Sequence, residues 1–162
     1  MTGKADFSDE EWTRLKRAPF VAGMAISLAD PGGPIELVKE TAATLKSVRE
    51  AAQGGRGDLV DDVARDAVAD AQLRQSPLRD FKVKGALAGQ EILEELAGVN
   101  RIVSEKATPG EADAYREWLR GAAREAADAA KEGGFMGFHA QRVSEGEQRM
   151  LDKLAEVLAP PA

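Results

Sequence analysis

The sequence predicts an all-α protein, a compact bundle of about six helices in a single domain. Three observations favour this class: helix-start signals recur along the chain, apolar residues step by three or four, and alternating runs of β-branched residues are absent. The length of 162 residues suits one domain, since domains cluster near about 100–150 residues. We expect the domain to span residues 1–159 and residues 160–162 to form a loose C-terminal tail.

Each element of the bundle has its own start signal. Three capping boxes open at Ser8, Thr108 and Ser144, each followed three residues later by Glu. Prolines at first-turn positions, Pro34 and Pro77, indicate two more starts, and Asp58 is a candidate cap for another. These signals predict helices near 8–29, 34–53, 58–75, 79–106, 109–132 and 144–158.

Local sequence features predict how these helices end and pack. Pro19 should split or kink the first element, separating residues 8–17 from 20–29. Gly85 and Gly89, four apart in the fourth element, should allow a neighbouring helix to approach closely, as should six alanines of the fifth. Those alanines are Ala122, Ala123, Ala126, Ala127, Ala129 and Ala130. We expect them to pack against larger side chains such as Trp12, Phe20, Tyr115 and Trp118.

Composition excludes several classes of site. The chain has no cysteine, which excludes disulfides, thiolate metal sites and cysteine nucleophiles, and its one histidine, His139, argues against imidazole metal sites. With 28 acidic against 22 basic residues the net charge is −6, which argues against nucleic acid as a partner. The basic residues around Arg14, followed by an apolar run, resemble a signal sequence. The acidic residues before them favour a buried core helix instead. We expect no transmembrane segment and a cytoplasmic location.

An acidic face is the first candidate site. It consists of Asp58, Asp62, Asp66 and Asp70, spaced four apart on one predicted helix. Like charges at this spacing repel, so the face requires counter-charges. One interpretation is an interhelical salt ladder with Arg116, Arg120 and Arg124, which have the same spacing. The other is a surface that attracts Ca²⁺, Mg²⁺ or a basic partner.

Two acidic turns form the second candidate. The first turn joins two predicted helices and has the sequence Ala29-Asp30-Pro31-Gly32-Gly33-Pro34-Ile35-Glu36. The second is a glycine-bearing turn that leads to Glu147. These turns resemble those of the tellurite-resistance TerB-like helical proteins. The resemblance implies a stress-response protein that binds a divalent cation, Ca²⁺ or Mg²⁺, through Asp30, Glu36 and Glu147. Pro31 stands where the family prefers glycine, and the second turn lacks the Asp. The alternative is that these acids cap helices and favour the positive ends of their dipoles.

The loop at residues 133–139 is the third candidate. It contains Phe135, Met136 and Phe138 among glycines, and His139 ends it. The apolar side chains either fold back over the bundle or project as a contact surface for a partner. His139 is expected to be a polar loop residue, because the motifs of hydrolases, dinucleotide enzymes and di-iron bundles are absent.

The sequence therefore predicts a non-enzymatic accessory or interaction protein that requires no cofactor. It would contact a protein partner through the 133–139 loop or the acidic face. The TerB-like cation binder is the first alternative, and an enzyme using a carboxylate–His139 pair is the second. A catalytic site made only of carboxylates and arginine, with Glu91, Glu94 and Glu95 as candidates, also stays open. The oligomeric state stays open, and a homodimer is compatible with the alanine-rich helices.

Overall fold

The fold is an all-α bundle in one domain, which confirms the predicted class. The computed structural model describes residues 1–29, 34–131 and 143–162, with the side chains of 34–37 and 131 left aside. These ranges contain no strand and form six α-helices and two short 3-10 helices. The α-helices are α1 (Asp9–Ala29), α2 (Pro34–Ala52), α3 (Asp58–Gln72), α4 (Ala88–Lys106), α5 (Pro109–Lys131) and α6 (Glu145–Val157). The 3-10 helices are η1 (Lys4–Asp6) and η2 (Gly85–Leu87).

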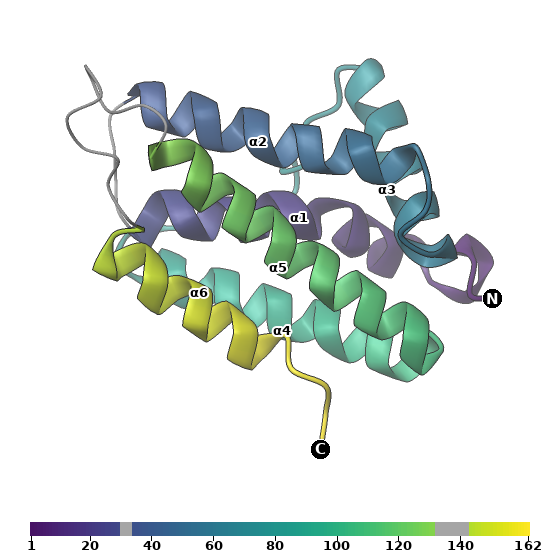
Figure 1. Cartoon of the computed structure of the whole chain (residues 1–162). Helices are drawn as coiled ribbons and strands as arrows, with labels where there is room; N and C mark the ends of the chain where they lie inside the picture. The colour runs from purple at the N-terminus through teal and green to yellow at the C-terminus, as the bar shows by residue number, and fades with distance from the viewer. Residues whose placement is uncertain (30–33, 132–142) are drawn as a thin grey trace.

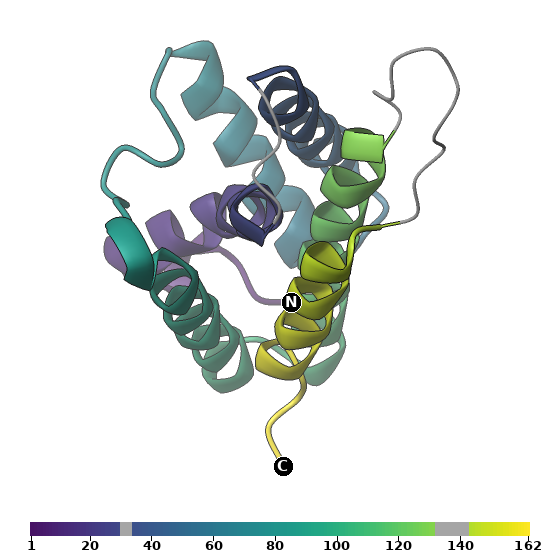
Figure 2. The ribbon, with the colours of Figure 1, turned by 90° about the vertical axis from the view of Figure 1, so that its left-hand side faces the viewer.

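Helix α1 is the central element of the bundle. It contacts each of the other five α-helices, and Figure 2 shows it in the middle with the others arranged around it. Its buried side chains step by three or four along one broad stripe, as the 3.6-residue period requires: Leu15, Ala18, Val21, Ala22, Ala25 and Ile26 are all fully buried. Helix α1 therefore connects the other five α-helices in one hydrophobic core.

Small side chains let α5 pack closely on its neighbours, as predicted. The most extensive helix–helix contact is between α2 and α5, which run side by side in Figure 1. On α5 the residues Ala122, Ala123, Ala126 and Ala127 are fully buried. The large side chains beside them, Tyr115 and Trp118, are also buried and meet edge to face, with ring centroids 5.7 Å apart.

All three predicted capping boxes are present. The hydroxyls of Ser8, Thr108 and Ser144 accept from the amides of the glutamates three residues later, and each glutamate carboxylate accepts from the cap amide. The predicted cap at Asp58 is wrong by one residue, because Gly57 is the N-cap of α3 and adopts φ 111°. A left-handed φ of this kind favours glycine over an aspartate.

Pro19 lies inside α1 without ending it. The helix runs unbroken from Asp9 to Ala29, so the expected division at Pro19 is wrong. Proline has no N–H, and the carbonyl of Leu15, four residues earlier, therefore loses its helical donor. The hydroxyl of Tyr115 on α5 donates to this carbonyl at 2.7 Å. The bond from α5 satisfies the acceptor that Pro19 leaves open, which is why the helix continues.

The predicted start of the fourth helix is also wrong. Residues 73–84, called the connection below, form turns and extended chain, and α4 begins only at Ala88. The Ser76 hydroxyl accepts from the Leu78 amide at 3.3 Å, which offers the backbone an alternative to a helical bond. Gly85, the first residue of η2, adopts φ 57°, a left-handed value that the interior of an α-helix does not contain. Pro77 therefore starts a turn, and the connection packs Leu78, Phe81 and Val83 against the core.

The close approaches occur at other glycines than those predicted. A Cβ at Gly85 or Gly89 would meet no atom within 4 Å, so neither mediates a tight contact. A Cβ at Gly98 of α4 would overlap the guanidinium of Arg14, and one at Gly146 of α6 would lie 2.6 Å from the carbonyl oxygen of Ala29. These two glycines bring α1 against α4 and α6.

Polar side chains hold the end of α6. Asn100 of α4 donates to the carbonyls of Val157 and Ala159, at 2.9 and 2.8 Å. Arg120 of α5 donates to the carbonyl of Leu158 at 2.7 Å. The last carbonyls of a helix have no partners within the helix, so these bonds act as a cap supplied by two neighbouring helices. In the described part of the chain, no helix has an apolar stretch long enough to cross a bilayer.

Candidate functional site

Half of the predicted acidic face is paired with cations of other segments. On α3, Asp66 accepts hydrogen bonds from Lys4 Nζ at 2.8 Å and from Trp12 Nε1 at 2.9 Å. Partial burial alone would raise the pKa of Asp66, but the bonds from Lys4 and Trp12 outweigh it and the pKa is lowered. Asp70 accepts from Lys16 Nζ at 2.5 Å. The two carboxylates thus fix the N-terminal segment and α1 to α3.

The expected counter-charges from α5 lie elsewhere. Arg116 is buried and donates to Asn100 Oδ1 and Ser104 Oγ of α4, and to its own helix at Asp113. Arg120 holds the end of α6. The predicted ladder from Arg116 and Arg120 to α3 is therefore wrong, because these arginines face α4 and α6.

The outer half of the face remains on the surface. Asp58 is exposed at the start of α3. Asp62 pairs within its own helix with Arg65 Nη1 at 3.0 Å, and both side chains are about half exposed. Such surface pairs contribute only about 0.3–0.5 kcal/mol. The face therefore has one half-buried half, Asp66 and Asp70, which pairs with other segments, and one half on the surface, Asp58 and Asp62.

The predicted cation ligands are only partly within the described chain. Asp30 lies outside it, and Glu36 lies in the first turn of α2 with its side chain not described. Glu147 is 5% exposed, and its carboxylate accepts from the amide of Ser144 at 2.8 Å. The capping alternative is thus observed for Glu147. Over the described ranges, no group of three His, Cys, Asp or Glu side chains is placed to hold a metal ion.

The other predicted groups are outside the described chain or dispersed. Phe135, Met136, Phe138 and His139 all lie in 132–142, outside the described residues. The three glutamates of α4 do not converge. Glu95 accepts from Arg14 and Arg17 of α1, Glu91 from the amide of Lys84, and Glu94 from Gln90. Each of the three carboxylates therefore has a separate structural partner.

An open groove lies between α2 and α5 and is called the α2–α5 groove below. Its volume is about 530 Å³. Three alanines and five charged side chains of the two helices line it: Lys39, Ala42, Ala43, Lys46, Glu50, Glu125, Asp128 and Ala129. Partial burial and the nearby charge of Glu50 raise the pKa of Glu125. The groove thus holds a carboxylate whose ionised form is less favoured than that of an ordinary exposed glutamate.

A smaller pocket opens between α1, α2 and the connection, and is called the α1–α2 pocket below. Its volume is about 120 Å³. Its lining is mostly apolar and includes Phe20, Gly23, Met24 and Leu78. One carboxylate, that of Glu40, lies among these groups and is only 3% exposed. The hydroxyl side chains of Ser27, Thr41 and Thr44 line it as well. Apolar walls with a few polar groups are the usual form of a small-molecule site.

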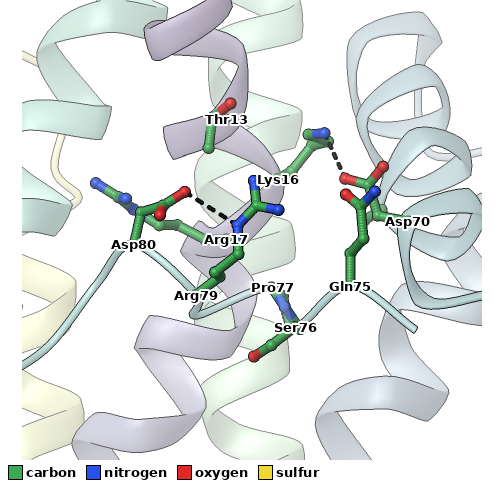
Figure 3. A pocket seen from close by; sticks show the side chains of 10 residues that line it. Thr13, Lys16, Arg17, Asp70, Gln75, Ser76, Pro77, Arg79 and Asp80 are labelled. Atoms are coloured by element: carbon green, nitrogen blue, oxygen red, sulfur yellow. Dashed lines mark hydrogen bonds and ion pairs between the residues drawn. The ribbon is translucent and has the colours of Figure 1, made fainter. Parts of the chain in front are cut away.

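A polar cleft of about 60 Å³ lies at the other side of the connection. Figure 3 shows Lys16 of α1 joined to Asp70 of α3, with Gln75 beside Asp70, and Arg79 joined to Asp80. Arg17 is held by Glu95, at 2.8 Å. Each cation that lines the cleft is thus already paired with a carboxylate, Lys16 with Asp70, Arg17 with Glu95 and Arg79 with Asp80, which weakens the attraction of the cleft for an anionic ligand.

Comparison with known proteins gives no further assignment. No family model, no curated protein and no solved structure matches the chain. The groove and the pocket are consequently assessed from their own geometry. The groove and the pocket are hard to predict from the sequence, because each brings together residues of separate elements. The one available signal is the alternation of Lys39, Lys46 and Glu50 with Ala42 and Ala43 along one side of the second predicted helix.

Proposed function

We propose that the protein is a non-enzymatic, cytoplasmic binding protein that receives a short helix of a partner protein in the α2–α5 groove. The observation that carries this proposal is the groove itself, about 530 Å³ in volume, which lies between two helices and has three alanines in its lining. Small side chains in such a lining let a third helix approach closely. Amphipathic helices commonly bind partners in grooves of this kind.

The charges of the groove indicate the chemistry of the partner. Lys39 and Lys46 lie on α2, and Glu50 and Glu125 approach each other near the end of that helix. A titratable group with a shifted pKa in a concave site is typical of binding sites. A lysine or arginine of the partner beside Glu125 would stabilise its ionised form and lower its pKa. The proposed partner helix therefore carries a basic residue on the face that enters the groove.

The exposed half of the acidic face and the 133–139 loop belong to the same proposal as additional contact surfaces. Helix α5 carries Glu125 in the groove and leads directly into the segment that contains this loop. Asp58 and Asp62 lie on α3, where their charges favour a basic partner. Asp66 and Asp70 are already used by Lys4 and Lys16, so the groove is the stronger candidate.

Photocrosslinking in cells of the source organism tests the proposal. A photoreactive amino acid at Ala42, an exposed groove residue, should give a specific adduct with one partner. The same probe at Ala155, exposed on α6, is the matched control and should give none. Glu125→Lys reverses the charge in the groove and should abolish the adduct at Ala42. The same adducts from both positions, or an adduct unaffected by Glu125→Lys, would contradict the proposal, and an adduct of two copies would replace the partner with a homodimer.

A divalent-cation site at the junction of α1 and α6 is the second proposal. It is favoured by the close approach of Gly146 to Ala29, which brings the residue before Asp30 next to the residue before Glu147. A cation that binds only the folded protein raises its melting temperature by mass action. We expect Ca²⁺ or Mg²⁺ at millimolar concentration to raise the melting temperature, and Asp30→Asn with Glu36→Gln to abolish the rise. An unchanged melting temperature with both metals would reject this second site.

A further inference from the structure

We infer that the α1–α2 pocket binds a neutral, compact aromatic molecule through apolar contacts alone. The inference goes beyond the partner groove, because the two sites share no lining residue. The pocket is formed by three segments that are distant in sequence: α1, α2 and Leu78 of the connection. Three properties identify its occupant: the volume, the side chains that still have surface to lose to a ligand, and the bonds of the polar groups.

The volume limits the size of the ligand. A cavity of about 120 Å³ is close to the ~150 Å³ of an engineered apolar cavity that takes up benzene. One lining residue, Thr41, is exposed, so the pocket opens to solvent and a ligand can enter. We therefore expect a ligand of about six to eight non-hydrogen atoms, the size of one substituted ring.

The surface that a ligand would cover is mainly apolar. Phe20, Met24 and Leu78 line the pocket and are each only partly buried, although they pack against the hydrophobic core. Covering them is favourable in proportion to the apolar area removed from water. The Met24 thioether adds a contact that aromatic rings favour, and the Phe20 ring can meet another ring edge to face. An aromatic ring therefore suits these walls.

The polar groups of the pocket already have partners within the protein. The Ser27 hydroxyl of α1 donates to the Glu40 carboxylate of α2, and the Thr44 hydroxyl donates to the Glu40 carbonyl at 3.0 Å. Glu40 and Thr41 each have a further partner. Glu40 and Thr44 are 3% and 2% exposed, so a ligand displaces almost no water from them. An apolar ligand leaves these bonds intact, whereas a charged ligand would give up its hydration without a free partner.

Gly23 shapes the inner end of the pocket. A Cβ at this position would overlap the Thr44 side chain, so α1 and α2 approach closely there. Gly23 and Thr44 are both buried. The inner end of the pocket thus belongs to the packed core, and the pocket is present before any ligand arrives. A preformed site avoids the cost of ordering side chains when a ligand binds.

Three one-ring probes with the same number of non-hydrogen atoms test the inference: ethylbenzene, benzyl alcohol and benzylamine. They differ only in the terminal group, which is a methyl, a hydroxyl or an ammonium. The readout is the ¹³C-methyl NMR signal of Met24, assigned by its loss in Met24→Leu. The Met150 methyl is the internal control, because Met150 does not line the pocket. We expect ethylbenzene to give saturable shifts of the Met24 signal, benzyl alcohol to bind more weakly, and benzylamine to bind at least about tenfold more weakly.

Variants distinguish the pocket from non-specific binding. Leu78→Trp should fill the pocket and abolish the shift with ethylbenzene. Leu73→Trp, on the same connection but 70% exposed, is the matched control that should leave the shift unchanged. Should Leu78→Trp fail to fold, Leu78→Ala replaces it. This variant enlarges the pocket and should bind n-butylbenzene more tightly, relative to ethylbenzene, than the parent does.

Two results with the unmodified protein would overturn the inference. One is binding of benzyl alcohol or benzylamine that equals or exceeds that of ethylbenzene, because it would show a hydrogen bond or an ion pair to the ligand. The other is the absence of a saturable Met24 shift with ethylbenzene. Binding that persists in a folded Leu78→Trp variant would also overturn it. None of these results bears on crosslinking at the α2–α5 groove, so the two proposals are tested separately.

Discussion

At the scale of single residues, buried polar atoms receive their partners from distant parts of the chain. The clearest case is the carbonyl of Leu15, which Pro19 deprives of its helical donor and to which Tyr115 donates at 2.7 Å. Tyr115 is fully buried, and burial followed by the charge of Glu95 raises its pKa well above the usual value. The hydroxyl therefore stays protonated and remains a donor over the whole range in which the protein is handled.

The first prediction concerns this bond. Tyr115→Phe leaves the Leu15 carbonyl buried without a partner, so we expect a loss of about 1–3 kcal/mol in the free energy of unfolding. Pro19→Ala restores a backbone N–H for the same carbonyl. Urea denaturation of both single variants and the double variant measures the coupling. In the Pro19→Ala background, Tyr115→Phe should cost clearly less than in the parent. Equal costs in both backgrounds would show that Tyr115 does not compensate for Pro19.

The same bond shows what the sequence could not predict. Pro19 within an apolar helical pattern indicates a helix break when only local rules are applied. Its tolerance depends on Tyr115, which is distant in sequence and lies on another helix. The three capping boxes, by contrast, are predictable because both partners lie within four residues. Local pairs can be recognised from spacing, whereas tertiary pairs require the packed structure.

The second prediction concerns Glu111 and pH. Burial alone would raise the pKa of Glu111, but hydrogen bonds from Thr108 and Thr2 outweigh it and lower the pKa to about 2. The pKa of Glu111 in the folded protein thus lies below the ordinary value of 4.5. The ionised carboxylate therefore stabilises the fold above pH 4.5, and this contribution is lost as the pH falls from about 4.5 to about 2. Glu111→Gln should cost about 1–2 kcal/mol at neutral pH. Because the parent loses the same contribution in acid, the difference between the two proteins should disappear near pH 2, as measured by urea denaturation. A constant difference across this range would contradict the assignment.

At the scale of elements, helix packing depends on where a side chain is absent. Gly146 allows the first turn of α6 to approach the last carbonyl of α1, whereas a Cβ at Gly121, in the middle of α5, would meet nothing within 4 Å. Both are helical and both are glycines, so sequence alone treats them alike. The structure separates a packing glycine from one that only weakens its helix.

The third prediction uses this matched pair. Gly146→Ala places a methyl group against the backbone of Ala29, which cannot move as a flexible side chain would, and we expect a loss of about 1–3 kcal/mol. Gly121→Ala adds no clash and lowers the entropy of the unfolded chain, so it should stabilise by about 0.5–1 kcal/mol. Thermal denaturation followed by circular dichroism measures both. Changes of the same sign in the two variants would show that helix propensity, and not the α1–α6 contact, controls the outcome.

Two elements also show where prediction from the sequence stops. The apolar stripe of α4 from Ala88 to Val103 is buried as its spacing indicates. The predicted start of α4 is too early because Pro77 and Ser76 can begin either a helix or a turn. Likewise the acidic face of α3 is visible as a pattern, but its counter-charges, Lys4 and Lys16, show no matching pattern of their own. Candidate surfaces are thus predictable from spacing, while their partners and the two concave sites are not.

At the scale of the whole molecule, one core connects all the helices. Buried side chains from α1 to α6 form a single cluster, centred on α1. The N-terminal segment is part of it, because Phe7 is buried and its ring lies 5.6 Å from that of Trp12. At the other end of the chain, Leu154 and Leu158 complete the cluster. No boundary divides the described helices into groups with separate cores, so we expect the bundle to unfold as one unit.

The fourth prediction tests this cooperativity with the two tryptophans. Trp12 reports on the contact of α1 with α3, through its bond to Asp66, and Trp118 reports on the alanine-rich face of α5. In Trp118→Phe the fluorescence comes from Trp12 alone, and in Trp12→Phe from Trp118 alone, because the chain has two tryptophans. Each substitution changes stability, so the comparison is made within one variant, between its fluorescence and its far-ultraviolet circular dichroism. Both probes should give the same urea midpoint and slope in each variant.

Separate midpoints in either variant would mean that the helices around α1 unfold in stages. In that case the α2–α5 groove, whose two helices make the most extensive helix–helix contact of the bundle, would unfold at a different urea concentration from the remaining helices. Binding at the groove would then have to be measured under conditions in which both probes report the native state, since a partner that binds only the folded groove shifts the unfolding of that part alone.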